Sequence, residues 1–219
     1  MLIVACAADC RKGLFWDLEK RVKDAGIEFR FGLLQPFSWN ALLMWEGMLA
    51  AEHPEDTLVF VDAWDFLFTG DAKELAALTD RHELLFHSEA VCWPEPHKAD
   101  LYPPCKTPWR YVNGTGPAGK GYAIAEAIEY GLTHFPIRGE EYDICADNDQ
   151  RFWTDVYLSG RGVVDTACEL SVSMNAVYRS QFEPVGRRLY LKETGSTPAF
   201  VHFNGYSRVE HEALMERLR

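Results

Sequence analysis

The chain has 219 residues, with 22 Lys and Arg against 33 Asp and Glu, so its net charge is −11 when His is neutral. That length fits one α/β domain, and a composition of 47% hydrophobic and 25% charged residues excludes disordered and fibrous classes. The acidic balance argues against nucleic-acid and membrane-surface partners, because both need a basic face. A polyanionic small ligand is still compatible with this acidic composition if a local group supplies positive charge.

The N-terminus reads as a first strand. Residues 2–7 are apolar, no basic region precedes them, and Asp9, Arg11 and Lys12 follow within a few positions, so no signal peptide fits. No apolar stretch approaches the roughly 20 residues of a membrane span. The six cysteines form no CxxC pair and are expected to be free thiols. We therefore expect a cytoplasmic chain.

Short β-rich runs alternate with helical stretches along the chain, which is typical of an α/β sheet. Strands are expected over residues 2–7, 27–33, 58–61, 84–87, 111–112, 188–192 and 200–202. Helices are expected over residues 14–25, 40–51, 72–79, 121–130, 150–158 and 208–218. Residues 92–108 hold five of the eleven prolines and are expected to form an ordered irregular loop. No linker or repeat divides the chain, so a single domain is expected.

An acidic pair follows one of these strands. The apolar run 58–61 leads into Asp62-Ala63-Trp64-Asp65, and ligands of open α/β sheets sit beyond the carboxyl ends of strands. Two carboxylates three residues apart can converge on one divalent cation. The alternative is a plain turn in which Asp65 caps a backbone N–H. Trp64 is either a core aromatic or a platform for a flat base.

Polar residues follow two other expected strands. His202 ends one of them and is followed by Asn204 and Gly205. An imidazole would complete an oxygen-rich site acceptable to manganese if it lay near the acidic pair, although a lone histidine is more often structural. Glu89 and Trp93 follow the strand at 84–87. Glu89 is either a helix cap or a substrate ligand, and Trp93 is either a packing residue or a platform for a sugar.

Two further segments carry candidate site residues. Asn113 begins a glycine-rich stretch that permits close approach of the backbone to a ligand. Asp147 and Asp149 precede the helix at 150–158, where Asp147 with Gln150 has the spacing of a helix cap. The functional alternative is that one of these carboxylates faces an acceptor hydroxyl.

Taken in order, these segments resemble the glycosyltransferase domain of the procollagen lysyl hydroxylases and their collagen glycosyltransferase relatives. The matching segments are 61–65, 88–94, 102–103, 110–114, 147–154, 164–165 and 202–205. The resemblance implies a GT-A fold, in which a Rossmann-like mixed sheet is flanked by helices. It also implies a nucleotide-binding half at 1–110 and an acceptor half at 111–219.

The resemblance also implies roles for individual residues. Asp62, Asp65 and His202 fall on metal ligands, with Mn²⁺ as the cofactor. Expected contacts to the sugar nucleotide come from Trp64, Trp93, Asn113, Asn204 and Gly205. Expected catalytic residues are Asp147, Asp149 and Glu89. The chain would thus transfer a hexose from a UDP-sugar to a hydroxyl of a glycan, peptide or small molecule. Alternatives are a catalytically silent nucleotide-sugar or glycan-binding module and, less favoured, a metal-dependent phosphoesterase.

Overall fold

The computed structural model describes residues 1–7, 13–137, 148–205 and 207–219. Its main sheet has six strands in the order β2-β1-β3-β6-β5-β7. These strands are β1 (Leu2–Ala7), β2 (Glu28–Leu33), β3 (Thr57–Asp62), β5 (Leu84–Glu89), β6 (Tyr111–Lys120) and β7 (Val163–Val164). The sheet is mixed because β6 runs antiparallel to both of its neighbours, β3 and β5. This confirms the expected mixed α/β sheet in a single domain.

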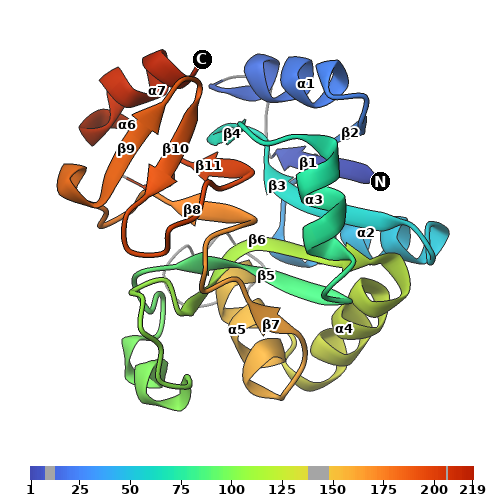
Figure 1. The fold of residues 1–219 in the computed structure, drawn as a ribbon. Coiled ribbons are helices and arrows are strands. Elements are labelled where there is room, and N and C mark those ends of the chain that lie inside the picture. Colours follow the sequence, from blue (N-terminus) through green and yellow to red (C-terminus); the bar gives the residue numbers. More distant parts are fainter. Residues whose placement is uncertain (8–12, 138–147, 206) are drawn as a thin grey trace.

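Helices cover both faces of the main sheet (Figure 1). On one face, α2 (Trp39–Glu52), α4 (Gly121–His134) and α5 (Asp149–Leu158) enclose one apolar core. On the other face, α1 (Phe15–Asp24) and α3 (Ala72–Thr79) enclose a second core. Successive residues of β1 and β3 enter the two cores alternately, as the period of two in a strand requires. A sheet buried on both faces explains why these strands are almost wholly apolar.

A second, smaller sheet packs beside the first (Figure 1). It contains β4 (Phe66–Phe68), β11 (Phe200–His202) and β8 (Ser171–Ser173), in the order β4-β11-β8. The hairpin of β9 (Phe182–Val185) and β10 (Arg188–Leu191), together with α6 (Ser207–Glu210) and α7 (Glu212–Leu218), completes this part. A third apolar cluster lies between these elements.

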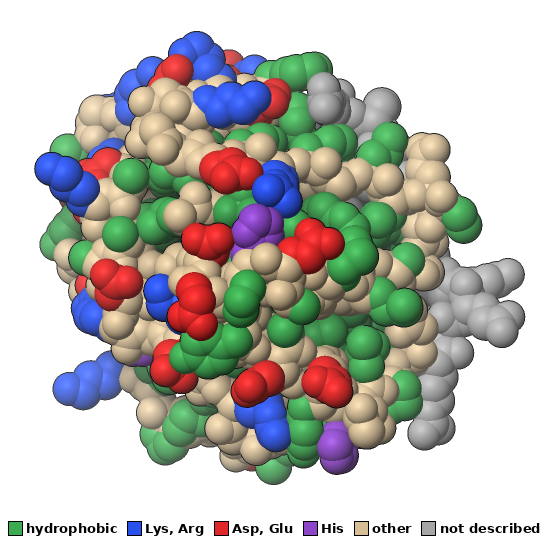
Figure 2. Space-filling model, turned by 90° about the vertical axis from the view of Figure 1, so that its right-hand side faces the viewer, with side chains coloured by type: hydrophobic (Ala, Val, Ile, Leu, Met, Phe, Trp, Pro, Cys, Tyr) green, Lys and Arg blue, Asp and Glu red, His purple; other side chains and the backbone are tan. Residues whose placement is uncertain are grey.

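The proline-rich stretch 92–108 includes the short 3₁₀ helix Pro96–Leu101. Among the described residues, no helix is long and apolar enough to cross a bilayer. Cys92, Cys105 and Cys168 are free thiols, which confirms the expectation for these three. On the face drawn in Figure 2, acidic and basic side chains are interspersed and hydrophobic side chains lie between them.

β6 departs from regular pairing at one place. Val112 pairs with Ser88 and Pro117 pairs with Phe86, so four residues of β6 stand opposite one residue of β5. We call residues 113–116 the β6 bulge. Bulges of this kind redirect side chains and are common beside active sites. The β6 bulge brings Asn113 and Thr115 toward the end of β3.

Candidate metal and donor site

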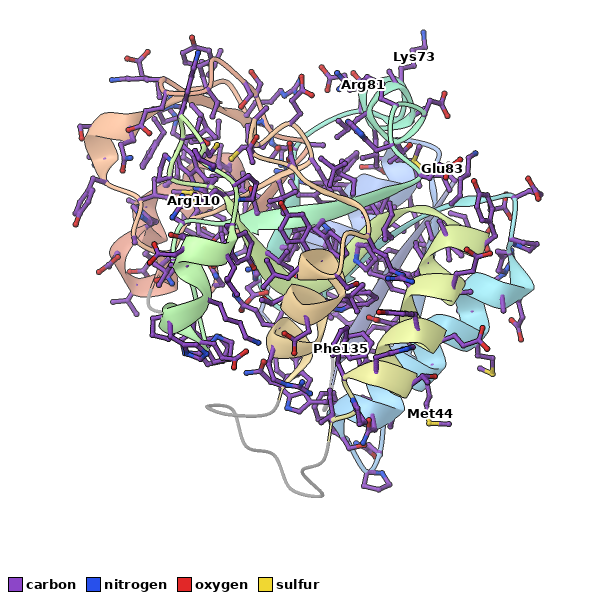
Figure 3. The ribbon with its side chains drawn as sticks, turned by 90° about the horizontal axis from the view of Figure 1, so that it is seen from below. Met44, Lys73, Arg81, Glu83, Arg110 and Phe135 are labelled. Carbon is purple, nitrogen blue, oxygen red and sulfur yellow. The ribbon has the colours of Figure 1, made fainter. Side chains whose placement is uncertain are left out.

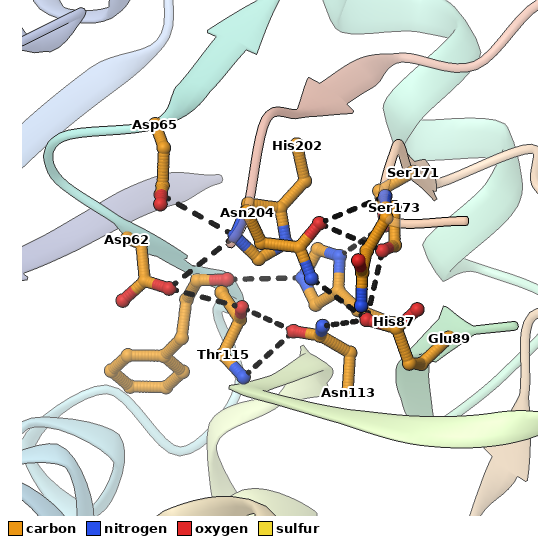
Figure 4. A network of polar contacts seen from close by, with 12 residues as sticks. Asp62, Asp65, His87, Glu89, Asn113, Thr115, Ser171, Ser173, His202 and Asn204 are labelled. Atoms are coloured by element: carbon orange, nitrogen blue, oxygen red, sulfur yellow. Dashed lines mark hydrogen bonds and ion pairs between the residues drawn. The ribbon is translucent and has the colours of Figure 1, made fainter. Parts of the chain in front are cut away.

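The acidic pair and the late histidine lie together. Asp62 ends β3, a turn covers residues 63–65, and the chain continues as β4, which pairs antiparallel with β11. In that register His202 is opposite Phe66, the residue next to Asp65. The Nε2 atom of His202 lies 3.3 Å from Oδ1 of Asp65 and 3.6 Å from Oδ2 of Asp62 (Figure 4). The pairing of β4 with β11 therefore positions all three side chains.

Burial and charge act in opposite directions on His202. The side chain is almost fully buried, and burial is the largest influence, which by itself lowers the pKa of the imidazole. The carboxylates of Asp65 and Asp62 favour the charged form more strongly in sum, so the pKa of His202 is raised above its usual value. The three ligand atoms lie within 4.8 Å of one another. Two carboxylates and one imidazole are a donor set that suits a divalent cation such as manganese.

Glu89 is the centre of a buried polar network beside this cluster. Its Oε2 atom accepts hydrogen bonds from Nδ2 of Asn204 (2.7 Å) and from Nδ2 of Asn113 (3.2 Å). The hydroxyl of Ser173 lies 2.8 Å from the same oxygen and 2.9 Å from Oδ1 of Asn204. Oε1 accepts from the backbone N–H of Ala90 at 2.9 Å. Glu89 thus holds the amides of two expected donor-contacting residues (Figure 4).

Thr115 connects the network to the acidic pair. Its hydroxyl lies 2.5 Å from Oδ1 of Asn113 and 3.4 Å from Oδ2 of Asp62. Its backbone N–H also donates to Oδ1 of Asn113 at 3.1 Å. The β6 bulge therefore links the end of β3 to the end of β5.

His87 lies beneath the network and is neutral. Its Nε2 donates to the carbonyl oxygen of Phe60 at 3.0 Å, so Nδ1 accepts from the hydroxyl of Ser171 at 2.7 Å. Burial, together with the nearby His202, lowers the pKa of His87 to about 3. This histidine supports the site without carrying charge.

Asp149 begins α5 beside the β6 bulge. The helix is capped by Asn148, whose Oδ1 accepts from the N–H of Arg151 at 2.9 Å. The predicted cap, Asp147, lies outside the described residues, and Asn148 holds the cap position instead. Burial, and then the charge of Asp62, raise the pKa of Asp149 well above its usual value. A carboxyl group with a raised pKa near a metal site is a candidate general base.

The remaining predicted residues lie around this centre. Trp64 occupies the turn between the two acids, is half-buried, and packs against the core under α1 and α3. Gly205 has φ +59° and faces Asn175, directly after Asn204. Trp93 is partly exposed on the loop after β5. Gly205 therefore lies next to the polar network, whereas Trp93 lies four residues beyond Glu89 in the chain.

Several members of the site were missed from the sequence. Ser173 gave no signal, because its three-residue strand was not predicted. Thr115 lies in a glycine-rich stretch that predicted only backbone flexibility. Glu46 is buried in α2 near Asp62 and Asp149, and these two acids are the charges that act on it. A charged residue in the middle of an apolar helix was the available signal for Glu46.

Comparison with known proteins identifies the family. A family model of the PLOD GT domain matches residues 41–218. An uncharacterized protein, R699, of Acanthamoeba polyphaga mimivirus is 26% identical over 198 residues, which are 86% of this chain and 40% of that protein. The human multifunctional procollagen lysine hydroxylase and glycosyltransferase LH3 is 29% identical over 177 residues, 78% of this chain and 22% of LH3. The chain therefore spans less than half the length of these relatives.

A solved structure shows the same fold. The crystal structure of a glycosyltransferase involved in the glycosylation of the major capsid of PBCV-1 superposes with a TM-score of 0.56 at 16% identity. The match covers 98% of both chains. The structural match thus shows a common fold, and the family model covers most of the sequence. The chain belongs to the family of PLOD glycosyltransferase domains.

Proposed function

We propose that this chain transfers a hexose from a UDP-sugar to a hydroxyl group of an acceptor, with Mn²⁺ held by Asp62, Asp65 and His202. The observation that carries the proposal is the convergence of these three ligand atoms within 4.8 Å in a chain of this family. The imidazole nitrogen faces both carboxylates from a buried position, which fits a metal ligand. A bound divalent metal would stabilise the negative charge of the leaving diphosphate.

The chain's own residues would then hold the two substrates. Trp64, in the turn between the acids, would stack against the uracil base. Glu89 would orient the amides of Asn113 and Asn204 toward the sugar nucleotide rather than exchange a proton itself, because its two carboxylate oxygens already accept hydrogen bonds. This assigns Glu89 a positioning role among the predicted catalytic residues.

Asp149 is the candidate that would receive the acceptor's proton if the reaction inverts the sugar's configuration. Burial and the charge of Asp62 raise its pKa well above the usual value, which makes its carboxylate a stronger base than an exposed one. Asp147 remains the second candidate from the sequence. If the reaction retains configuration, these acids would orient the acceptor hydroxyl without taking its proton in a separate step.

The test is Mn²⁺-dependent release of UDP from a panel of UDP-sugars with glycan, peptide and small-molecule acceptors. Asp62→Asn and Asp65→Asn are expected to lower the rate by about a hundredfold or more, since several kcal/mol of charge stabilisation depend on the metal. Asp24→Asn is the matched control, because it removes one negative charge from an exposed ion pair on α1.

Three results would contradict the proposal. Unchanged Mn²⁺ binding and UDP release in both site variants would remove the metal assignment. Tight Mn²⁺-dependent UDP binding without turnover on every donor and acceptor would instead favour a binding module. Release of phosphate from simple esters, with no sugar nucleotide present, would favour a phosphoesterase.

A further inference from the structure

α2 carries a buried acid that none of the roles above uses. Glu46 is 4% exposed and lies on the inner side of the helix with Leu43, Leu49 and Ala50. Met44, two positions earlier, is exposed and points away from the molecule (Figure 3). Residues two apart on a helix lie on nearly opposite sides, so Glu46 points toward the sheet. An apolar residue would ordinarily occupy such a position.

One oxygen of this carboxyl is unsatisfied. Within the described part of the chain, Oε2 of Glu46 is buried and has no hydrogen-bond partner. Buried polar atoms are nearly always hydrogen-bonded, and an exception of this kind needs an explanation. Leaving a polar group unpaired in the interior destabilises the fold. A ligand that supplies the missing partner is the explanation we pursue.

The unsatisfied carboxyl faces the β6 bulge next to Asp149. A Cβ atom added to Gly116 would lie 3.5 and 3.6 Å from the two carboxylate oxygens of Glu46. A Cβ added to Gly114 would lie 3.0 Å from Oδ1 of Asp149. Two acids, one from α2 and one from α5, therefore lie against two glycines of the same bulge. The missing side chains of these glycines leave room for both carboxyl groups.

The electrostatic setting of Glu46 favours its protonated form. Burial, and then the charges of Asp149 and Asp62, raise its pKa well above the usual value. The neutral carboxyl has an O–H group and can donate a hydrogen bond. The metal-type cluster found among the described residues consists of Asp62, Asp65 and His202, and does not include Glu46 or Asp149.

The position relative to the metal cluster indicates which part of a ligand would reach Glu46. Asp62 is exposed at the end of β3, and Asp149 and Gly114 are half-buried, so the bulge reaches solvent at Gly114 while its other three residues are buried. A diphosphate held beside Asp62 would direct its attached sugar along the bulge toward Asp149 and Glu46. A hydroxyl-bearing, uncharged sugar suits this place, whereas the carboxylate of a uronic acid would lie near the charge of Asp62.

We propose that Glu46 is a sugar-contacting residue that donates a hydrogen bond from its carboxyl group to a hydroxyl of the donor sugar and favours neutral hexoses over uronic acids. This inference rests on the proposed function, because it needs a sugar nucleotide in the site. It assigns to α2 a role in choosing the donor, and it gives a reason for a buried, unpaired acid in an apolar helix.

The experiment compares the affinities of UDP and UDP-sugars by calorimetry with Mn²⁺ present. The neutral probes are UDP-glucose, UDP-galactose and UDP-N-acetylglucosamine, and the anionic probe is UDP-glucuronate. Wild-type protein should bind its best neutral sugar nucleotide more tightly than UDP-glucuronate. Glu46→Leu should weaken the neutral sugar nucleotide by roughly five- to tenfold, the effect of one lost hydrogen bond, and leave the affinity for UDP unchanged.

Three variants serve as comparisons. Glu46→Gln keeps the shape and an N–H donor, so it should bind the sugar nucleotide within about twofold of wild type. Glu46→Asp keeps the carboxyl but shortens its reach, so it should lose affinity much as Glu46→Leu does. Glu52→Leu changes the exposed acid at the end of the same helix and should alter neither affinity.

Thermal unfolding separates a structural role from a binding role. Glu46→Leu should raise the melting temperature, because an apolar side chain replaces an unsatisfied polar one. A melting temperature that falls, with equal losses for UDP and for UDP-sugar, would overturn the inference in favour of a purely structural acid.

Other outcomes are equally decisive. If Glu46→Leu and Glu46→Asp kept the same ratio of UDP-sugar affinity to UDP affinity as the wild-type protein, the inference would be overturned. The proposed function would not be affected. A loss in Glu46→Gln as large as that in Glu46→Leu would exclude the hydrogen-bond donor. Absence of Mn²⁺-dependent UDP binding in the wild-type protein would defeat the proposed function itself.

Discussion

The contacts of Glu89 distinguish between a catalytic and a positioning role for this carboxylate. A catalytic carboxylate needs an oxygen that can reach the reacting atoms, whereas a positioning carboxylate has its oxygens engaged by the groups it orients. Oε2 of Glu89 is the shared acceptor for Asn113 and Asn204, and Oε1 accepts the N–H of Ala90. These contacts join the end of β5 to the β6 bulge and to the residues after β11.

Replacing Glu89 by Gln should therefore lower stability as well as activity. The amide that replaces one carboxylate oxygen presents N–H groups to donors that already point at it. The expected cost is about 1–3 kcal/mol in the free energy of unfolding, the cost of leaving a buried group unpaired. Urea unfolding followed by circular dichroism measures it. Unchanged stability with abolished UDP release would instead favour a catalytic role for Glu89.

Trp64 is predicted to contribute to base binding. Trp64→Ala should weaken UDP binding by about 1–3 kcal/mol, the usual contribution of one base stacked on an aromatic ring. Calorimetry with UDP and Mn²⁺ measures the change. Trp16→Ala, which removes an exposed tryptophan from α1, is the control. Equal UDP affinities in wild type and Trp64→Ala would leave Trp64 as a residue that only packs against the core.

Among the single elements, β6 contains a position at which the fold requires glycine. Gly116 has φ +90°, and an added Cβ would lie 3.0 Å from Cβ of Phe60. Gly160, after α5, has φ +92° with no atom within 4 Å of an added Cβ. The two glycines share one backbone conformation and differ in their surroundings. They allow backbone strain and steric crowding to be measured separately.

Gly160→Ala should cost about 1–2 kcal/mol of stability, from the strain of a side chain at positive φ. Gly116→Ala should cost a further 1–3 kcal/mol or so, because its Cβ also crowds a fully packed core residue. Chemical denaturation of both variants gives the comparison. Equal losses would mean that Phe60 and its neighbours move aside without cost.

How well each element could be predicted depended on its local signal. β1, β11 and α3 have the expected bounds, because short apolar runs mark the strands and a capping residue marks the helix. Asp71 caps α3, accepting from the N–H groups of Lys73 and Glu74. The expected last helix is divided into α6 and α7 at His211, and it begins at Ser207, one residue before the expected start.

The missed elements lack such signals. β6 was expected over two residues and covers ten, because its glycines and Pro117 predict a turn while tertiary pairing makes a strand. β4, β7, β8 and β9 are two to four residues long, too short for a period to be recognised. The proximity of Asp62, Asp65 and His202 could be predicted from residue types and the family resemblance. The hydrogen bonds of Ser173 and Thr115 could not, because they depend on strand register.

At the scale of the whole molecule, the sequence division into halves at residue 110 is not a boundary of the fold. β6, from the second part of the chain, lies in the main sheet between β3 and β5 from the first part. The division stays a prediction about function. Chain segments from both halves also form the polar network around Glu89.

With a net charge of −11, we expect the protein to need a divalent metal for nucleotide binding. UDP is anionic, and the cluster that would receive it consists largely of acids. Removing divalent metal with EDTA should therefore weaken UDP binding at least about tenfold, since unscreened like charges repel. Uridine, which lacks the diphosphate, is the control and should bind equally weakly with and without Mn²⁺. Metal-independent UDP affinity would show that other groups supply the positive charge.

The placement of His202 on the small sheet has a consequence for folding. Asp62 belongs to the main sheet, whereas His202 belongs to β11, 140 positions later in the chain. A cation bound to both residues would join the two sheets, so we expect its affinity to depend on the packing of one sheet against the other. Partly folded chains with only the main sheet formed would hold the ion weakly. Metal binding measured during refolding would therefore show when the two sheets come together.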